Sequence, residues 1–401
     1  MPINESESEN QKKNTFIASN IFLLGLVSFF TDISTEMVYP ILPLYLSSIL
    51  GASPAIIGII EGIAESLASI VKFVSGILAD KFGNKKRLAF IGYSSSLINK
   101  VIILLAGTWA GVLLARVIDR FGKGIRTAPR DALIAESAGA SALGRAYGLH
   151  KGLDLLGTAT GIFLAFVILS INSEDYRKIF LFSLIPAVLG IICILFVKDK
   201  KQQSGSREFS FNFKNLDRKF KIFLVFIFIF TLGNSSNAFI ILRTKAAGFS
   251  SSQAILLYFL FNITASLLAY PVGRLSDKIG RRKILVTGYL LYALVYFGLG
   301  FFTHKTIYIA LFVLYGFYTA MTTGVERALV AELAGKSQKG SALGLHSAVT
   351  GLGLLPASII AGFLWESLGQ AVPFFFGASL GLITAAGVFI LFARERKHEQ
   401  A

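Results

Sequence analysis

Residues 76–87 read GILADKFGNKKR, and residues 273–283 read GRLSDKIGRRK. Both stretches contain the pattern Gly-x-Leu-x-Asp-Lys-x-Gly, closely followed by basic residues, and Asp277 lies 197 positions after Asp80. That separation is close to half of the 401-residue chain. A charged motif repeated at half the chain length predicts that the protein consists of two copies of one ancestral unit.

Three further short stretches repeat in nearly the same register. ALIAE at 132–136 returns as ALVAE 196 positions later, and AYGLH at 146–150 returns as ALGLH at the same offset. LGAS at 50–53 corresponds to AGFS 197 positions later. The agreement of four stretches predicts two homologous halves of about six helices each. Because six is an even number, both halves enter a membrane from the same side and form parallel repeats.

The composition is that of a membrane protein. Hydrophobic residues make up 54% of the chain, charged residues only 15%, and the mean hydropathy is +0.66. A soluble protein of this size needs more polar surface to cover its core. Apolar windows of roughly 20 residues therefore predict an all-α membrane protein with about twelve transmembrane helices. We expect these helices near 17–48, 55–79, 87–106, 109–127, 144–169, 179–197, 221–242, 252–272, 284–302, 306–325, 342–365 and 371–393.

Polar segments divide the chain into five parts. We expect an N-terminal tail at 1–16, a first six-helix bundle at 17–197, a linker at 198–220, a second six-helix bundle at 221–393 and a C-terminal tail at 394–401. The first predicted span is longer than a bilayer requires and contains two prolines, so we expect a kink near its outer end.

The chain has a net charge of +16, and its basic residues follow the way in which the chain crosses the membrane. Lys and Arg concentrate in the tails, the linker and alternate loops, and the positive-inside rule then places both termini in the cytoplasm. We expect a multi-pass protein of the plasma or inner membrane. Nucleic acid is not an expected partner, because the chain offers no groove or patch with groups that read bases.

The doubled stretch resembles the signature loop of the major facilitator superfamily. The matching positions are Gly76, Asp80, Lys81 and Gly83 between the second and third helices, and Gly273, Asp277 and Gly280 between the eighth and ninth. Arg116, Asp119 and Gly122 in the fourth helix resemble a second motif of the superfamily, although Asp119 and Arg120 stand where that pattern usually has Gln and Gly.

This resemblance covers nearly the whole chain. It implies a twelve-helix secondary transporter in which two bundles rock against each other, and it does not imply a substrate. Drug–proton antiporters of the superfamily often have a glycine-rich fifth helix with a Gly-Pro step. The helix near 144–169 has the glycines without the proline.

Two groups of residues are candidates for a gate at the inner side. The motif aspartates could accept hydrogen bonds from the N-terminus of a neighbouring helix and so latch the closed state; alternatively, the basic cluster only fixes topology. Arg130-Asp131 and Glu326-Arg327 occupy matching places with the order of charge reversed. They could form ion pairs between the bundles, or they could cap helices and contact lipid headgroups.

Ionisable residues at membrane depth are costly and usually face a cavity or a partner. The first half is rich in them and the second half has amides at several corresponding places. The candidates for a cavity or charge network are Asp32, Glu36, Glu61, Glu65, Lys72, Lys100, Arg116, Asp119 and Arg120, with Asn234, Asn237 and Asn262 in the second half. This pattern predicts that the titratable groups are confined to the first bundle.

We expect one or two of the acids to bind and release a proton during transport. A carboxyl in a cavity of low dielectric constant favours its protonated form, and a nearby arginine favours the charged form. Glu36 is the first candidate, followed by Asp32, Glu65 and Glu61, with Arg116 as a charge partner. The alternative is permanent ion pairing that only holds helices together.

The sequence disfavours enzymatic function. It has no Cys/His metal set, no phosphate-binding loop and no nucleophile elbow, so we expect no cofactor and no metal. The expected function is proton-coupled efflux of a small amphipathic organic compound by a monomer. Proton-coupled uptake of an organic anion or nutrient remains the alternative among transporters, and a non-transporting membrane sensor remains the alternative from another class.

Overall fold

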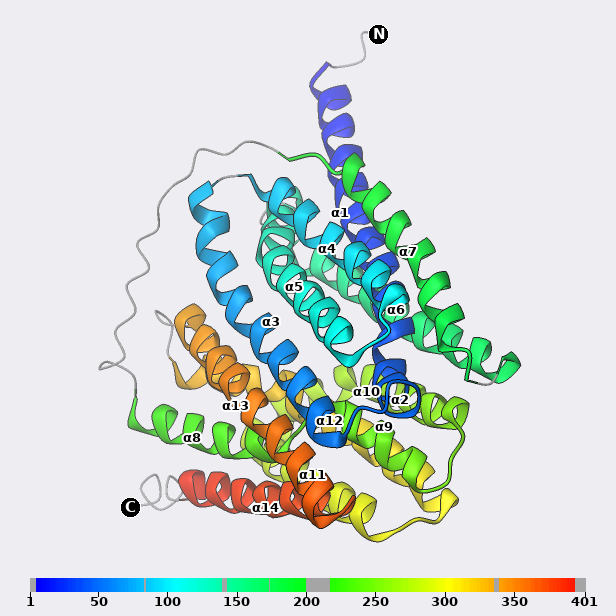
Figure 1. The fold of residues 1–401 in the computed structure, drawn as a ribbon. Helices are drawn as coiled ribbons and strands as arrows, with labels where there is room; N and C mark the ends of the chain where they lie inside the picture. The colour runs from blue at the N-terminus through cyan, green and yellow to red at the C-terminus, as the bar shows by residue number, and fades with distance from the viewer. Residues whose placement is uncertain are drawn as a thin grey trace, which may run out of the picture. The chain divides into compact units, whose positions relative to one another are not determined.

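The computed structural model describes residues 5–82, 84–138, 143–172, 174–199, 217–334 and 339–393, including all of their side chains except those of 5–19, 73, 74, 76–82 and 339–341. Every regular element in these residues is helical (Figure 1). In chain order the elements are α1 (Glu5–Val38), η1 (Tyr39–Ile41), α2 (Leu42–Ser48), α3 (Pro54–Phe82), α4 (Lys85–Leu105), α5 (Trp109–Ala138), α6 (Leu143–Ile171), α7 (Tyr176–Phe196), α8 (Arg218–Gly233), α9 (Asn237–Ala246), α10 (Ser251–Ile279), α11 (Arg281–Phe301), α12 (Lys305–Leu333), α13 (Lys339–Leu368) and α14 (Val372–Ala393).

These helices provide the predicted number of membrane spans. Within the described residues, eleven segments are long and apolar enough to cross a membrane. The twelfth, α5, has 30 residues but carries too many charges to qualify by hydropathy. The predicted all-α membrane fold of about twelve spans is therefore confirmed. Helices satisfy every backbone hydrogen bond within one segment, which is what a lipid environment requires.

Two of the spans are interrupted. The first passes through the 3₁₀ turn η1 at Tyr39–Ile41, where Pro40 cannot supply an α-helical hydrogen bond; this is the expected kink. The seventh ends as α8 at Gly233 and restarts as α9 at Asn237, with Ser236 as the N-cap. The sequence analysis expected a membrane helix near 221–242; the span is present at Arg218–Ala246, and the break within it was not predicted. Ser236 caps the new helix by accepting a hydrogen bond from the Ala238 amide at 3.3 Å.

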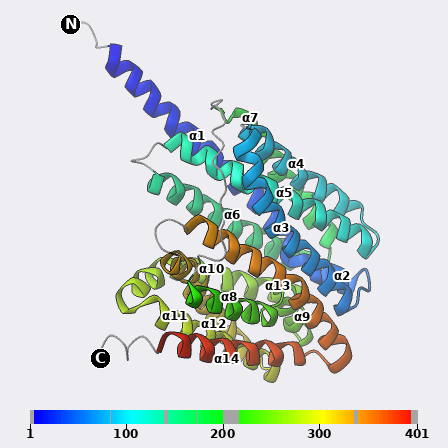
Figure 2. The same ribbon diagram turned by 90° about the vertical axis from the view of Figure 1, so that its left-hand side faces the viewer.

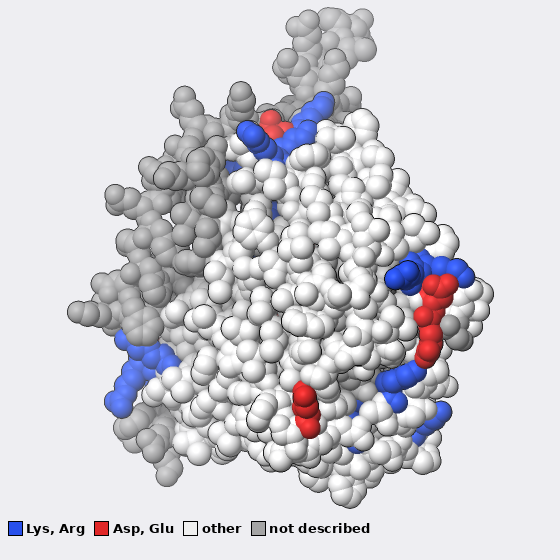
Figure 3. Space-filling model, viewed as in Figure 1, with Lys and Arg blue, Asp and Glu red and all other residues white. Residues whose placement is uncertain are grey.

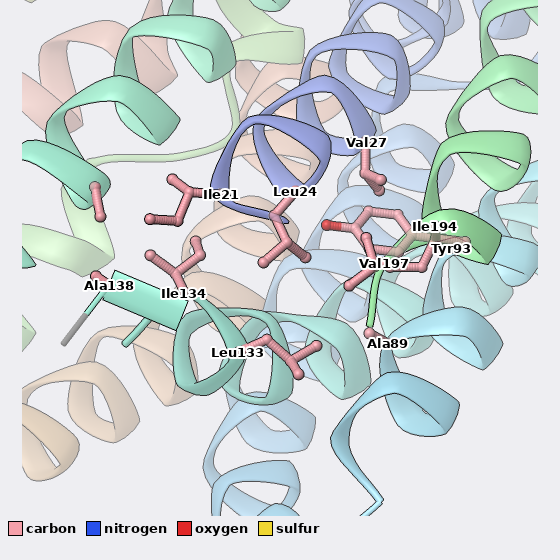
Figure 4. Packing of buried hydrophobic residues seen from close by; sticks show 11 residues of the cluster. Ile21, Leu24, Val27, Ala89, Tyr93, Leu133, Ile134, Ala138, Ile194 and Val197 are labelled. Atoms are coloured by element: carbon pink, nitrogen blue, oxygen red, sulfur yellow. The ribbon is translucent and has the colours of Figure 1, made fainter. Parts of the chain in front are cut away.

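The chain forms two compact units that do not follow the midpoint of the sequence. Unit 1 contains the described residues within 1–39, 70–168 and 175–208, and unit 2 contains those within 40–69, 169–174 and 209–401. In unit 1, α4 packs along α5 and α1 packs along α7. Figure 4 shows the apolar core between these helices, where Leu24 and Val27 of α1 meet Tyr93 of α4.

Unit 2 is built from the later helices together with the first part of α3. Here α11 packs against α12 and α14, α10 packs against α12, and α8 packs against α13 and α14, as the turned view in Figure 2 also shows for α8 and α14. On the face shown in Figure 3, most of the described surface is uncharged. Large apolar side chains such as Leu105 and Tyr270 are more than three-quarters exposed, as expected of a surface that meets lipid chains.

Candidate functional site

Unit 1 contains a buried group of charged side chains on α4 and α5. Arg116, Asp119 and Arg120 lie three to four residues apart on α5 and so share one face of that helix. Lys100 of α4 lies opposite, with its Nζ 3.8 Å from Asp119 Oδ1. All four residues are at most 4% exposed. The sequence analysis predicted these residues as one network, and the structure brings them together.

Tyr39 covers the two arginines of this group. The guanidinium carbon of Arg116 lies 5.1 Å from the centre of the Tyr39 ring, and that of Arg120 lies 5.4 Å from it. Both distances are typical of cation–π contacts. The sequence analysis did not single out Tyr39. Its position next to Pro40, where α1 becomes η1, is the signal that could have indicated a special role.

A second charged group lies where α1 meets α6. The carboxyl of Asp32 faces the carboxyl of Asp154 at close range, and Lys151 Nζ lies 2.6 Å from Asp154 Oδ2. Close packing of the helices makes this possible. A Cβ at Gly157 would lie 2.5 Å from the carbonyl oxygen of Phe29, so only glycine allows this approach.

Glu36 lies near the same helix contact. A Cβ at Gly161 would lie 3.1 Å from the Cβ of Glu36, which places Glu36 against α6 one turn beyond Asp32. Asp154 was not among the predicted proton-coupling residues. The signal for it was present, because Asp154 follows Lys151 by three residues on a glycine-rich helix face.

The remaining predicted acids lie elsewhere. Glu61 is 1% exposed and accepts a hydrogen bond from Ser236 Oγ at 3.1 Å, so it belongs to unit 2 and contacts the start of α9. Glu65 follows one turn later on α3 and is partly buried, whereas Lys72 is exposed. These three candidates for the charge network are therefore divided between the units, since residues up to Ser69 pack in unit 2 and those from Ile70 pack in unit 1.

The predicted amides of unit 2 contact the tyrosines of α12 in two of three cases. Asn234 Nδ2 donates to the Tyr318 hydroxyl at 3.3 Å, and the Tyr315 hydroxyl donates to Asn237 Oδ1 at 3.0 Å. Both amides flank the break between α8 and α9. Asn262 instead donates to the backbone carbonyl of Tyr258 on its own helix at 2.8 Å.

An aromatic cluster surrounds this break. Tyr292 stacks against Tyr296 with ring centres 4.1 Å apart and lies 4.9 Å from Tyr318. Phe230 of α8 lies 4.7 Å from Tyr289 and 4.8 Å from Tyr292. All of these rings are at most 5% exposed. They provide flat, polarisable surfaces with a few hydroxyl groups.

The predicted gate residues are described only in part. Gly76, Asp80 and Lys81 have no described side chains, and Gly83 lies outside the described residues. In the second copy of the motif, Asp277 Oδ1 lies 2.9 Å from Arg281, and Gly280 between them has a φ of +100°. That backbone conformation favours glycine. Gly273 is partly buried in α10.

The other predicted gate pairs have partners within their own units. Arg130 lies 2.9 Å from its neighbour Asp131, and Glu326 Oε1 lies 2.6 Å from His346 Nε2. Arg327 is exposed. The pairing of Glu326 with His346 was not expected, because the sequence analysis considered Glu326 only together with Arg327, as part of an ion pair between the bundles or as a helix cap. Among the residues that the structure describes, no group of three His, Cys, Asp or Glu side chains could hold a metal ion.

Comparisons with known proteins agree with this architecture. The family model of the Major Facilitator Superfamily matches residues 24–224 and again residues 222–401. An uncharacterized MFS-type transporter of Methanocaldococcus jannaschii is 35% identical over 391 residues, covering 96% of this chain and 97% of the relative. A multi-drug resistance efflux pump homologue of Lactococcus lactis subsp. lactis is 24% identical and covers 88% and 91% of the two chains. The crystal structure of the nucleoside transporter NupG has a similar fold, with a TM-score of 0.79 at 14% identity over 93% of this chain and 98% of that one.

Proposed function

Because the chain belongs to the major facilitator superfamily, whose members move solutes across membranes, we propose that it couples the efflux of a small amphipathic organic compound to the movement of protons. The observation that carries this proposal is the close pair of carboxyls, Asp32 and Asp154, between α1 and α6. Two charged carboxylates in contact repel each other, and a single proton shared between them removes this repulsion.

The surroundings of the pair support a site that can gain and lose this proton. Lys151 lies 2.6 Å from Asp154 and stabilises the charged form of that carboxyl, which leaves Asp32 as the group that carries the proton. If α6 shifts along α1 and separates the carboxyls, water can reach Asp32 and the proton can leave. Asp32 therefore stays a proton-coupling candidate, and Asp154 joins it as the acceptor.

Glu36 stays a candidate because it lies at the same helix contact. Glu61 is a weaker candidate for a mobile proton, since its carboxylate already accepts a hydrogen bond from Ser236 in a fully buried place. This contact suits a role in holding α3 against α9 in unit 2. We keep Glu65 as a candidate on its position alone.

The aromatic cluster of unit 2 supports an amphipathic organic substrate. It offers ring faces and hydroxyl groups rather than a dense set of charges. Relatives with the name of a multi-drug resistance pump match most of the chain. Alternating exposure of a site between two bundles is the general way in which such transporters work, and we propose it here.

The buried basic group favours a second candidate function. Lys100, Arg116 and Arg120 outnumber Asp119, the one acid of that group, and two of them lie over Tyr39. A carboxylate or phosphate substrate would be recognised by such a group through bidentate contacts. Proton-coupled uptake of an organic anion is therefore the alternative.

We propose that the protein is a monomer in the plasma or inner membrane, with both termini in the cytoplasm. The argument is the distribution of Lys and Arg along the chain. A test is the accessibility of Cys193, the single cysteine, compared with cysteines introduced into the two tails. Labelling of the tails from outside intact cells would contradict the orientation.

Transport by the purified protein in proteoliposomes tests the coupling. We would impose a pH gradient and screen lipophilic cations, organic anions and neutral aromatic compounds, following both the solute and the internal pH. Asp32→Asn and Asp154→Asn should abolish proton movement driven by substrate. The matched control is Asp175→Asn, which changes an exposed carboxylate at the start of α7.

Three outcomes separate the candidates. Unchanged pH dependence in both pair variants would contradict a coupling role for the pair. Transport of organic anions alone would favour the alternative function. No transport of any solute under any gradient would favour the non-transporting sensor.

A further inference from the structure

The two halves of the chain end in similar short segments. FVKDKK at 196–201 corresponds to FARERK at 392–397, at an offset of 196. Each segment follows the last helix of its half, α7 or α14, and contains one acid between basic residues. The acid of the first segment, Asp199, belongs to the described residues, whereas Glu395 of the second lies outside them. We call residues 394–401 the C-terminal tail.

In the first half, Asp199 binds the start of α4. Its Oδ2 accepts a hydrogen bond from the backbone amide of Lys86 at 2.9 Å, and Lys86 Nζ donates to the backbone carbonyl of Leu195 at 2.7 Å. The first amides of an α-helix have no acceptor within the helix, and a carboxylate at this end also meets the positive end of the helix dipole. Asp199 therefore caps α4 and connects it to the end of α7.

In the second half, the corresponding helix start lies beside a groove in unit 2. The groove has a volume of about 1070 Å³, and its walls include Arg281, Arg282 and Lys283 of α11 and Phe389, Phe392 and Ala393 of α14. Arg282 is the residue that corresponds to Lys86. Ala393 is the last described residue of the chain, so the C-terminal tail begins at the wall of the groove.

An ion pair next to each helix start shows that the two sites are built alike. Lys85 of α4 forms an ion pair with Glu136 of α5, and Arg281 of α11 forms one with Glu332 of α12. The two pairs correspond to each other at an offset of 196. The contact that Asp199 makes is therefore a suitable guide to the second site.

The N-cap residue of α11 has no side chain, unlike that of α4. Asn84 caps α4, since its side chain accepts a hydrogen bond from the Arg87 amide at 3.3 Å. The corresponding residue of the second half is Gly280, which cannot make this contact. A carboxylate in the place of Asp199 would supply an acceptor that Gly280 does not.

The charges at the groove also suit a carboxylate. Three consecutive cations begin α11 at residues 281–283, and the guanidinium carbon of Arg282 lies 4.5 Å from the centre of the Phe392 ring. This contact places a positive charge beside the last turn of α14. An acid just beyond that turn would meet both this charge and the positive end of the α11 dipole.

From this correspondence we propose that the C-terminal tail docks in the groove, with the Glu395 carboxylate accepting a hydrogen bond from the backbone amide of Arg282. Glu395 is two residues beyond Ala393, and two residues of extended chain reach about 7 Å, so the carboxylate can enter the groove at this wall. Docked in this way, Glu395 caps α11 and connects it to the end of α14, as Asp199 connects α4 to the end of α7.

This inference goes beyond the proposed function, because it depends neither on a substrate nor on proton coupling. It makes Glu395 a positioning residue for the second copy of the doubled motif. Asp277 and Gly280 of that motif line the same groove, so a docked tail holds the loop between α10 and α11 in place.

Hydrogen exchange at the first turn of α11 tests the inference in the purified full-length protein. Mass spectrometry of peptides that cover residues 280–287 would compare the wild type with Glu395→Ala. Exchange in this variant should rise about 3- to 30-fold there, as expected for the loss of a helix cap. Asp199→Ala is the reference within the same chain, because it should raise exchange at the start of α4 by a similar factor and leave α11 unchanged.

Two further variants of the tail control for its composition. Glu395→Asp should exchange as the wild type does, because the corresponding residue of the first half is an aspartate. Glu399→Ala removes another carboxylate of the same tail and should also leave exchange unchanged.

Four results would overturn the inference. They are unchanged exchange in Glu395→Ala, an equal rise in Glu399→Ala, a full loss of protection in Glu395→Asp, and protection that follows the presence of phosphatidylglycerol in the micelles instead of Glu395. The last result would assign the groove to an anionic lipid.

Discussion

Asp119 is the residue whose neutralisation we expect to destabilise unit 1 most. Its side chain is 3% exposed, and four cations face it, namely Lys100 of α4 and Arg116, Arg120 and Arg126 of α5. Asp119→Asn keeps the size of the side chain but removes the counter-ion that these cations share. Buried charges that lose a partner are far more costly than exposed ones, because neither water nor another ion can replace it.

The magnitude follows from the closest pair. For 3.8 Å between Lys100 Nζ and Asp119 Oδ1, Coulomb's law with an effective dielectric constant of about 20 gives an attraction of roughly 4 kcal/mol. Removing one member of a buried pair typically costs about 3–5 kcal/mol, and we expect Asp119→Asn to lower the free energy of unfolding by this amount. Lys100→Met removes one cation and leaves the carboxylate beside three others, so its loss should be less than half as large.

Unfolding by sodium dodecyl sulfate in mixed micelles measures this difference. The chain has two tryptophans, and Trp109 at the start of α5 reports on unit 1 in a Trp365→Phe background. Where unfolding is not reversible, unfolding rates replace the equilibrium values. Equal losses in the two variants, or a larger loss in Lys100→Met, would refute the reasoning that Asp119 is the shared counter-ion.

Three further changes test single contacts by the same unfolding measurement. Gly161→Val should lower the free energy of unfolding by about 1–3 kcal/mol, since its Cβ would lie 2.5 Å from the Ile33 carbonyl oxygen. A stability equal to that of the wild type would contradict close packing of α1 on α6. Tyr39→Ala should lower the free energy of unfolding by about 1–2 kcal/mol through lost cation–π contacts. Tyr39→Phe keeps the ring and should be as stable as the wild type. Equal losses of stability in the two variants would exclude the ring as the cause. Ser236→Ala should lower the free energy of unfolding by about 1–3 kcal/mol, because it takes a hydrogen-bond donor from the buried carboxyl of Glu61. No loss would show that this carboxyl is satisfied in another way.

Most of the fold could be predicted from the sequence, because lipid leaves few alternatives. An apolar segment of sufficient length in a bilayer has to be helical, and the repeated loop at 76–87 and 273–283 fixed the pairing of the two halves. The interruption at 234–236 was not predicted. The polar run Gly-Asn-Ser-Ser-Asn was visible, but hydropathy averaged over a window is insensitive to a break of three residues.

The members of the charge network could be predicted better than their partners. Periodicity places Arg116, Asp119 and Arg120 on one face of α5, and burial of all three agrees with that reading. It does not say which residue of another helix lies opposite, because that depends on how the two helices are rotated about their axes. The pairing of Asp119 with Lys100 and of Asp32 with Asp154 therefore needed the structure.

One change of charge has given two corresponding sites of the duplicated chain different electrostatic surroundings. Tyr93, Arg130 and His150 of the first half correspond to Tyr289, Glu326 and His346 of the second, each at an offset of 196. His150 and Arg130 both lie within 3.5 Å of Ser28 Oγ, so a proton on His150 would meet a like charge. His346 lies 2.6 Å from Glu326, so a proton on His346 meets an opposite charge. Since the sign of a Coulomb interaction follows the product of the charges, the exchange of Arg130 for Glu326 gives the two corresponding histidines surroundings of opposite charge.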